Sequence, residues 1–177
     1  MVPILPSGEN TSAAPLTWND SPLKEGEATF FELSGCYRRY HEPLSRSVYL
    51  GKLPQFMLDA SQALIEGLEA GLTQAKPGNT TADVANALNA VLMKHGIDRG
   101  GARCGCSIGL SYPPDWGELT YSLRSTDTTV LEPSMTFHFM PGLWMDTWGL
   151  ETTETVLITD TGCETLCSTE RKLFVKD

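Results

Sequence analysis

Two consecutive amphipathic helices are the feature that most constrains how this chain can fold. Pro54 suits the first turn of a helix, and apolar residues then recur on one face at helical spacing. This stripe comprises Met57, Ala60, Leu64, Leu68 and Leu72. A turn at 76–79 follows, after which Thr80 caps a second helix, with Asp83 three residues later in a capping-box arrangement. The spacing therefore predicts a pair of helices, each with one apolar face.

The second helix is expected to end at Gly96, a residue type that suits a helix C-terminus. Its predicted inner face consists of Val84, Leu88, Val91 and His95. Strand-like runs flank the helix pair; they cover 28–33 and 44–50 before it, and 104–110, 135–141, 149–159 and 171–175 after it. Strands, two helices and strands again indicate an α+β fold, in which the helices cover one face of a curved, mostly antiparallel sheet.

The totals describe a soluble globular protein of one domain. The chain has 177 residues, of which 41% are hydrophobic and 20% charged, enough for a substantial core. Its net charge is −9, from 22 acidic and 13 basic side chains. Such a surface repels phosphate backbones, so we expect no nucleic-acid partner.

Nothing in the sequence points to a membrane or to secretion. No apolar run approaches the roughly 20 residues that cross a bilayer, and the first residues lack the basic start of a signal peptide. Five cysteines, an odd number, do not form a disulfide framework, and three histidines give weak support for a zinc site. We therefore expect a protein of the reducing cytoplasm.

A glycine-rich strand provides the first link to a known family. The stretch Gly105–Leu110, closely followed by Tyr112–Glu118, resembles the Gly-His-Gly-Ile-Gly-Leu-x-x-His-Glu signature of the pita-bread hydrolases, which include aminopeptidases, dipeptidases and creatinase. Cys106 takes the place of the first histidine, and Pro113-Pro114 that of the His-Glu pair. The resemblance implies a pita-bread fold.

The same resemblance places the chain within that fold. Pita-bread domains contain the helix, Lys-Pro-Gly, helix form twice, and this chain has only the second copy. We expect residues 1–177 to be the C-terminal part of a catalytic domain. Its expected parts are a leading loop (1–26), strands (27–51), the helix pair (54–96) and further strands (103–177). Strand 28–33 would then have an unpaired edge and the inner helix faces incomplete cover, so we expect a homodimer or a partner that supplies the missing half.

The metal ligands of the family are largely lost. Metal-dependent members use two Asp, one His and two Glu, and the resemblance places these at Glu32, Pro43, Cys106, Met140 and near Thr153. Pro and Met supply neither a carboxylate oxygen nor an imidazole. The resemblance therefore implies a branch that uses no metal and no cofactor.

A closer resemblance covers nearly the whole chain. The segments 32–41, 43–46, 107–118, 137–146 and 148–151 are similar to the ectoine-hydrolase branch of this family. That branch opens the cyclic amidine ring of ectoine, a small zwitterion, to acetylated 2,4-diaminobutyrate. The resemblance implies a C–N hydrolase. The alternatives are a non-catalytic relative that binds a small zwitterion or acts as an interaction module and, disfavoured by Pro43 and Met140, a metal-dependent Xaa-Pro aminopeptidase or dipeptidase.

Four side chains are the catalytic candidates. Glu32, at a former ligand position, is expected to point into the pocket and to pair with the amidinium or attack its carbon; otherwise it pairs structurally with Arg38 or Arg46. His138 would transfer protons, or be a core histidine with satisfied hydrogen bonds. One of Glu151 and Glu154 is expected to face the pocket as a second acid, and the other to be exposed or ion-paired.

Further residues are candidates for substrate binding. Aromatic faces attract a cation, so aromatic side chains near the strands could form the wall of the pocket, although ordinary packing explains them equally well. These candidates are His41, Cys106, Tyr112, Asp115, Trp116, Trp144 and Trp148. Cys106 is expected to be a small wall residue and not a nucleophile, because no base beside it is evident in the sequence.

Overall fold

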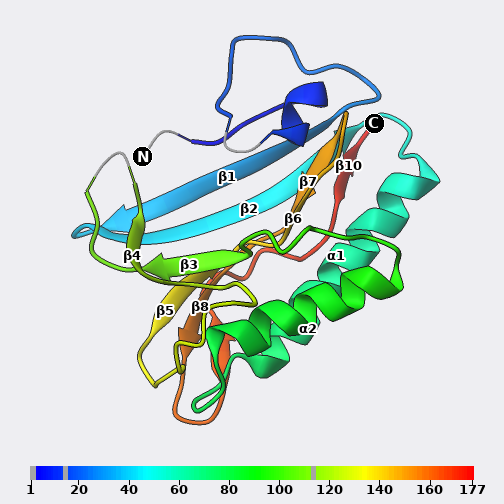
Figure 1. Ribbon diagram of the computed structural model, residues 1–177. Coiled ribbons are helices and arrows are strands. Elements are labelled where there is room, and N and C mark those ends of the chain that lie inside the picture. Colours follow the sequence, from blue (N-terminus) through cyan, green and yellow to red (C-terminus); the bar gives the residue numbers. More distant parts are fainter. Residues whose placement is uncertain (1–2, 14–15, 113–114) are drawn as a thin grey trace.

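The computed structural model describes residues 3–13, 16–112 and 115–177 (Figure 1). The predicted replacement of a His-Glu pair by Pro113-Pro114 lies outside these residues. The elements in chain order are the 3₁₀ helix η1 (Gly8–Ser12), β1 (Ala28–Tyr37), β2 (Tyr40–Leu50), α1 (Gln55–Gln74), α2 (Thr81–Lys94), β3 (Gly105–Ile108), β4 (Gly117–Ser122), β5 (Thr136–Phe139), β6 (Gly142–Trp144), β7 (Gly149–Glu151), β8 (Glu154–Ile158), β9 (Cys163–Thr165) and β10 (Phe174–Lys176).

A long antiparallel hairpin, β1–β2, includes both strands predicted before the helices and extends them. Its register runs from Ala28 opposite Tyr49 to Tyr37 opposite Tyr40. Arg38 and Arg39 form the two-residue turn with φ of 49° and 70°, the left-handed conformation that such tight hairpin turns require. β10 joins the other edge of β2 as a parallel strand.

The remaining strands form a five-stranded antiparallel sheet, ordered β4-β3-β5-β8-β9, and the two-stranded sheet β6–β7. The run 149–159, predicted as one strand, is divided. Thr152 and Thr153 leave the sheets between β7 and β8 because their backbone pairs with β2, where the Thr153 N–H donates to the Ser45 carbonyl at 3.1 Å. This break lets one segment contribute to two sheets.

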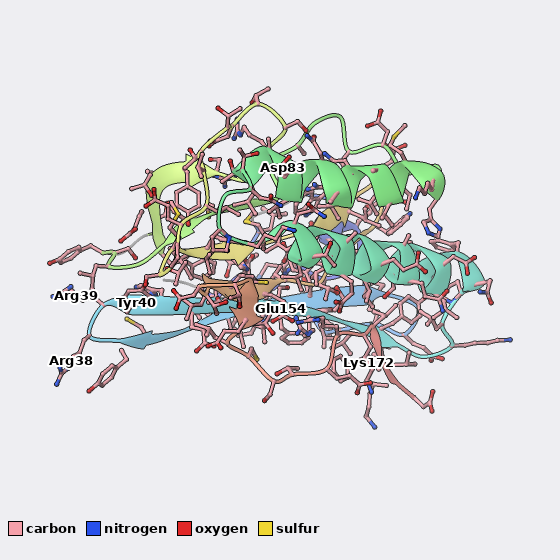
Figure 2. All side chains as sticks on the ribbon, turned by 90° about the horizontal axis from the view of Figure 1, so that it is seen from below. Arg38, Arg39, Tyr40, Asp83, Glu154 and Lys172 are labelled. Atoms are coloured by element: carbon pink, nitrogen blue, oxygen red, sulfur yellow. The ribbon has the colours of Figure 1, made fainter. Side chains whose placement is uncertain are left out.

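The helices lie side by side on one face of the strands, as predicted (Figures 1 and 2). Thr80 and Asp83 form the capping box at the start of α2. The core between helices and sheets contains Leu64, Leu68, Leu88, Phe137 and Phe139, all fully buried. We expected the inner faces of the helices to be incompletely covered. This prediction is wrong for these positions.

Two residues assigned to the inner face of α2 lie elsewhere. Val91 is half-buried and His95 is exposed, while Ala85 and Leu92 are buried instead. Val91, three positions beyond Leu88, lies at the rim of the face formed by positions 84, 85, 88 and 92, and His95 is the C-cap residue that follows the last residue of α2. His95 Nε2 lies 2.9 Å from Glu66 Oε2 on α1, at the surface.

The leading segment is more ordered than a loop. Ile4 forms a bridge with Glu32 and Ser7 one with Thr29, so the outer edge of β1 is paired at these two positions. The Ile4 N–H donates to the Glu32 carbonyl at 3.0 Å, and the Glu32 N–H donates back at 2.9 Å. The prediction of a wholly unpaired edge for strand 28–33 is wrong there, and the backbone of Glu32 is fixed on both sides.

In the part of the chain that the structure describes, no helix is both long and apolar enough to cross a membrane.

Candidate active site

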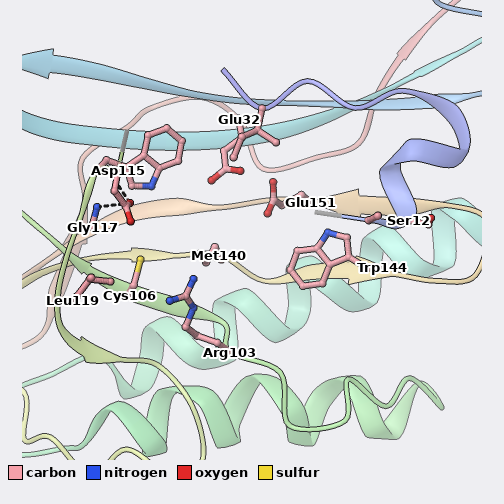
Figure 3. A pocket seen from close by; sticks show the side chains of 13 residues that line it. Ser12, Glu32, Arg103, Cys106, Asp115, Gly117, Leu119, Met140, Trp144 and Glu151 are labelled. Atoms are coloured by element: carbon pink, nitrogen blue, oxygen red, sulfur yellow. Dashed lines mark hydrogen bonds between the residues drawn. The ribbon is translucent and has the colours of Figure 1, made fainter. Parts of the chain in front are cut away.

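A cavity of about 600 Å³ opens between the β1–β2 hairpin and the strands that follow the helices (Figure 3). Each side contributes a different kind of residue. β1 and β7 supply acids, β6 an indole, and the segments around β3 and β4 a thiol and a guanidinium. The lining residues are Ile4, Ser12, Ala13, Glu32, Arg103, Cys106, Asp115, Trp116, Gly117, Leu119, Met140, Trp144 and Glu151.

Glu32 points into this cavity from β1 (Figure 3). Glu32 is only 6% exposed, and burial raises the pKa of its carboxyl to about 7. Neither arginine considered as a structural partner reaches it: Arg38 lies over the Tyr37 ring in the hairpin turn, and Arg46 binds Glu154. A carboxyl that titrates near neutrality without an arginine partner is suited to chemistry.

Glu151 is the second acid of the cavity. It ends β7, is fully buried, and its Oε2 has no hydrogen-bond partner among the described residues. Burial raises the pKa of its carboxyl well above the usual range, and the nearby charge of Glu32 raises it further. Because two close carboxylates disfavour each other's ionisation, an ionised Glu32 favours the protonated form of Glu151.

His138 lies next to Glu32 and is not among the residues that line the cavity. Its Nδ1 is 3.7 Å from Glu32 Oε1, and the Trp116 ring meets it edge-on with centroids 6.2 Å apart. The side chain is fully buried, and neither ring nitrogen has a hydrogen-bond partner among the described residues, so it is not the satisfied core histidine considered above. Burial, reinforced by the charge of Arg103, lowers its pKa to about 3. The surroundings of His138 therefore favour its neutral form.

Glu154, a catalytic candidate from the sequence, lies outside the cavity. Its Oε1 binds Arg46 Nη2 at 2.5 Å and Arg171 Nε at 2.9 Å in a buried ion pair. The odd spacing from Glu151 to Glu154 and the break between β7 and β8 direct the two side chains to different places. Of the two acids, Glu151 thus faces the pocket and Glu154 is ion-paired.

Four of the seven binding candidates line the cavity: Cys106, Asp115, Trp116 and Trp144. Asp115 Oδ1 accepts hydrogen bonds from the N–H groups of Trp116 at 2.7 Å and Gly117 at 3.0 Å, and so shapes the turn before β4. The indole Nε1 of Trp144 is buried without a partner among the described residues. It is therefore a free donor at the cavity wall.

The other three binding candidates do not reach the cavity. His41 is buried within the hairpin, with Ser34 Oγ 3.4 Å from its Nδ1 and Cys36 Sγ 3.6 Å from its Nε2. Tyr112 is 66% exposed, and Arg39 lies over its ring at 4.2 Å. Trp148 packs edge-on against Phe56 of α1, with centroids 5.6 Å apart. These residues became candidates because they are close in sequence to pocket residues. In each case, contacts with other segments direct the side chain away from the cavity.

Arg103 is the charged lining residue that the sequence interpretation missed. It directly precedes the strand of Cys106, and this position beside a recognised signature was the available signal. Ile4, Ser12 and Ala13 were missed as well, since they reach the cavity only through the pairing of the leading segment with β1. No local pattern marks such residues.

The residues at the former ligand positions do not fit the family's metal pair. Met140 lines the cavity with a thioether, and Pro43 offers only a carbonyl, which accepts from the Thr155 hydroxyl at 2.8 Å. The Thr153 hydroxyl accepts from the Ser45 N–H at 2.6 Å. Among the described residues, no three His, Cys, Asp or Glu side chains gather closely enough to hold a metal. Glu32 alone keeps a carboxylate at its ligand position.

The helix pair packs against the strands, and the cavity lies between the hairpin and the strands that follow the helices. This arrangement defines a pita-bread protein. The chain belongs to metallopeptidase family M24, whose family model matches residues 1–160. It is 62% identical to a protein named ectoine hydrolase from Halomonas elongata, over 99% of this chain and 44% of the relative. It is 24% identical to the Xaa-Pro dipeptidase of Pyrococcus furiosus, over 97% of this chain and 48% of the relative.

Solved structures agree on the fold. The dipeptidase PepE from Mycobacterium ulcerans superposes with a TM-score of 0.92 at 23% identity, covering 99% of this chain and 47% of that chain. The prolidase from Pyrococcus furiosus gives 0.89 at 22% identity, covering 97% and 50%. At such identities the likeness concerns the fold alone. The chain spans about half the length of these relatives.

Proposed function

We propose that this chain carries the site of a hydrolase that opens the cyclic amidine ring of ectoine to acetylated 2,4-diaminobutyrate. The observation that supports it is the pair of buried acids, Glu32 and Glu151, whose pKa values are raised by burial and which both face a cavity of small-molecule size. The 62% identity to a protein named ectoine hydrolase supports ectoine as the substrate. Five free cysteines suit the reducing cytoplasm, which we propose as the compartment.

The two acids suit the two halves of the reaction. A Glu32 oxygen bonds to the amidine carbon, and the carbon–nitrogen π electrons move to a ring nitrogen. One ring C–N bond then breaks, and its electron pair leaves with the nitrogen, which takes the Glu151 proton and becomes an amine. Water attacks the carbon still bound to Glu32 and gives one proton back to Glu151 and one to the amine. Breakage of the bond to Glu32 frees the acetylated product.

The alternative role of Glu32 leads to the same products. As a carboxylate it would pair with the amidinium while water attacks the carbon directly. A covalent adduct on the Glu32 peptide after acid quenching would identify the nucleophile, and its absence in single-turnover samples would favour the pairing role. Because Glu32 alone keeps a carboxylate at the former ligand positions, we propose that neither route uses a metal, and chelator treatment should leave the rate unchanged.

The test is incubation of the purified chain with ectoine, followed by mass spectrometry for the ring-opened product. Glu32→Gln keeps the size of the side chain and removes its charge, so turnover should fall by at least about a thousandfold. Glu42→Gln, which changes an exposed glutamate of the same hairpin, is the matched control and should keep full activity. Absence of product with the wild-type chain would refute the proposal, and full activity of Glu32→Gln would refute the role of Glu32.

Stability separates loss of chemistry from loss of folding. Because the pKa of Glu32 is raised from 4.5 to about 7 by burial, ionisation of Glu32 opposes folding. Its favourable contribution is complete below pH 4.5 and is lost as the pH rises through about 7. Glu32→Gln should therefore be more stable than the wild type at pH 8, by up to about 3 kcal/mol, and nearly equal to it at pH 4. Urea unfolding at both pH values measures this difference.

A further inference from the structure

A positive charge lies across the cavity from its two acids. Arg103 precedes β3, is exposed, and directs its guanidinium into the cavity beside Cys106, while Glu32 and Glu151 approach from the other side (Figure 3). Among the described residues, no carboxylate forms an ion pair with Arg103, and no group accepts a hydrogen bond from its side chain. The cation is therefore available to a ligand.

The space between these charges is largely apolar. Met140 lies between the acids and the guanidinium, the Cys106 thiol lies beside the guanidinium, and Trp144 borders the cavity on the opposite side from Cys106 (Figure 3). Asp115 is the other acid of the lining, and its Oδ1 is engaged by the N–H groups of the turn before β4. The charge of Arg103 is felt across the site, since it adds to the lowering of the His138 pKa and counteracts the effect of burial on the Cys106 pKa.

This separation of charge suits a zwitterion in one orientation only. An amidinium is attracted to the Glu32 carboxylate, and a carboxylate matches the planar fork of a guanidinium, which can bind both of its oxygens. We propose that Arg103 binds the carboxylate of the substrate and thereby directs the amidinium carbon toward Glu32. This inference rests on the proposed function and adds a specificity-determining residue to it.

Selectivity follows from this role. The site should prefer cyclic amidines that carry a carboxylate over the same ring without one. The preference should come from binding more than from the chemical step, because Arg103 does not touch the bond that breaks. Removal of a hydrogen bond between charged groups weakens binding by roughly 10- to 100-fold.

The experiment combines two variants with two substrates. Arg103→Gln removes the charge, and Arg124→Gln, which changes an exposed arginine outside the cavity lining, is the matched control. KM and kcat are measured for ectoine and for 2-methyl-1,4,5,6-tetrahydropyrimidine, the same ring without its carboxylate. Arg103→Gln should raise KM for ectoine by roughly 10- to 100-fold, change kcat much less, and leave KM for the carboxylate-free ring unaltered. The KM of Arg103→Lys for ectoine should lie between the values of the wild type and Arg103→Gln, and the KM of Arg124→Gln should equal the wild-type value.

A second measurement reads binding without turnover. In the Glu32→Gln background, calorimetry with ectoine should show the same loss of affinity when Arg103→Gln is added. An equal loss for both rings, or an unchanged KM and affinity for ectoine, would overturn the role of Arg103 while leaving the proposed function intact. A wild-type chain that neither opens nor binds ectoine would instead refute the proposed function, and the inference with it. Thermal unfolding of each variant checks that the variant is folded under the conditions of the kinetic and binding measurements.

Discussion

At the scale of single residues, the cavity brings two buried carboxyls, Glu32 and Glu151, close enough to influence each other's ionisation. Burial raises both pKa values, that of Glu32 to about 7, and the charge of Glu32 raises that of Glu151 further. An ionised Glu32 therefore favours the protonated form of Glu151. The surroundings of His138 favour its neutral form, which adds no charge beside them. Two carboxyls whose surroundings separate their pKa values can serve as base or nucleophile and as acid in one reaction.

This interaction predicts a bell-shaped pH profile for kcat/KM with ectoine. The rate should increase about tenfold per pH unit below pH 7, where Glu32 gains its charge, and fall again at higher pH, where Glu151 loses its proton. Because the two carboxyls interact, the two apparent pKa values belong to the pair. Glu151→Gln should lower kcat and abolish the alkaline fall. Initial rates between pH 5 and 10 test this, and a profile that stays flat through pH 7 would contradict the role of Glu32.

At the scale of elements, the break between β7 and β8 assigns two nearby acids to different tasks. β7 delivers Glu151 to the cavity, and the two threonines that follow attach the chain to β2. β8 then begins at Glu154, whose carboxylate joins Arg46 of β2 and Arg171 near the C-terminus. Arg46 also donates to the carbonyls of Ser45, Thr153, Thr169 and Glu170. Glu151, before the break, thus faces the candidate site, and Glu154, after the break, binds arginines that connect the strands.

Removing the charge of Glu154 should destabilise the fold without touching the cavity. Glu154→Gln leaves the buried guanidinium of Arg46 without its counter-charge, a change that costs about 3–5 kcal/mol in such pairs. Glu164→Gln, at an exposed position of β9, is the control and should change the free energy of unfolding by less than about 0.5 kcal/mol. Urea unfolding at pH 7 measures both. A Glu154→Gln variant as stable as the control would show that the carboxylate contributes little.

At the scale of the whole molecule, the cavity is assembled from segments far apart in the chain. The leading segment, the hairpin, the strands after the helices and the turn before β4 all border it, and the helix pair supports the strands from behind (Figure 1). This assembly leaves some edge positions open. Beyond Glu32, the outer edge of β1 has no strand partner among the described residues, and Leu33 and Tyr37 are 47% and 73% exposed there.

Self-association therefore remains our prediction for this chain. An open strand edge with exposed apolar side chains favours pairing with a second copy. Light scattering should give a multiple of the 19.3 kDa chain mass. Leu33→Lys places a charge on the open edge and should shift the population toward the monomer, whereas Leu23→Lys, at an exposed position before β1, should not. A monodisperse wild-type monomer would contradict the prediction.

The sequence by itself determined the local elements and the chemistry that was lost. The two helices follow from apolar spacing and from the Thr80–Asp83 cap, because those interactions join residues three or four positions apart. Pro43 and Met140 could be excluded as carboxylate ligands from their side chains alone. Glu32 could be placed in the pocket because a recognisable pattern surrounds it.

Only the tertiary structure decided which side chains meet. Glu151 rather than Glu154 faces the cavity because the chain leaves the sheets at Thr152 and Thr153 to pair with β2. Arg103 enters the cavity, whereas Tyr112 stays outside it, and neither position follows from a local pattern. Such outcomes depend on strand register and on backbone pairing between distant segments, and in a strand a shift of one residue reverses every side chain. The periodicity of a segment fixes its own two faces, but the partner that covers each face comes from elsewhere in the chain.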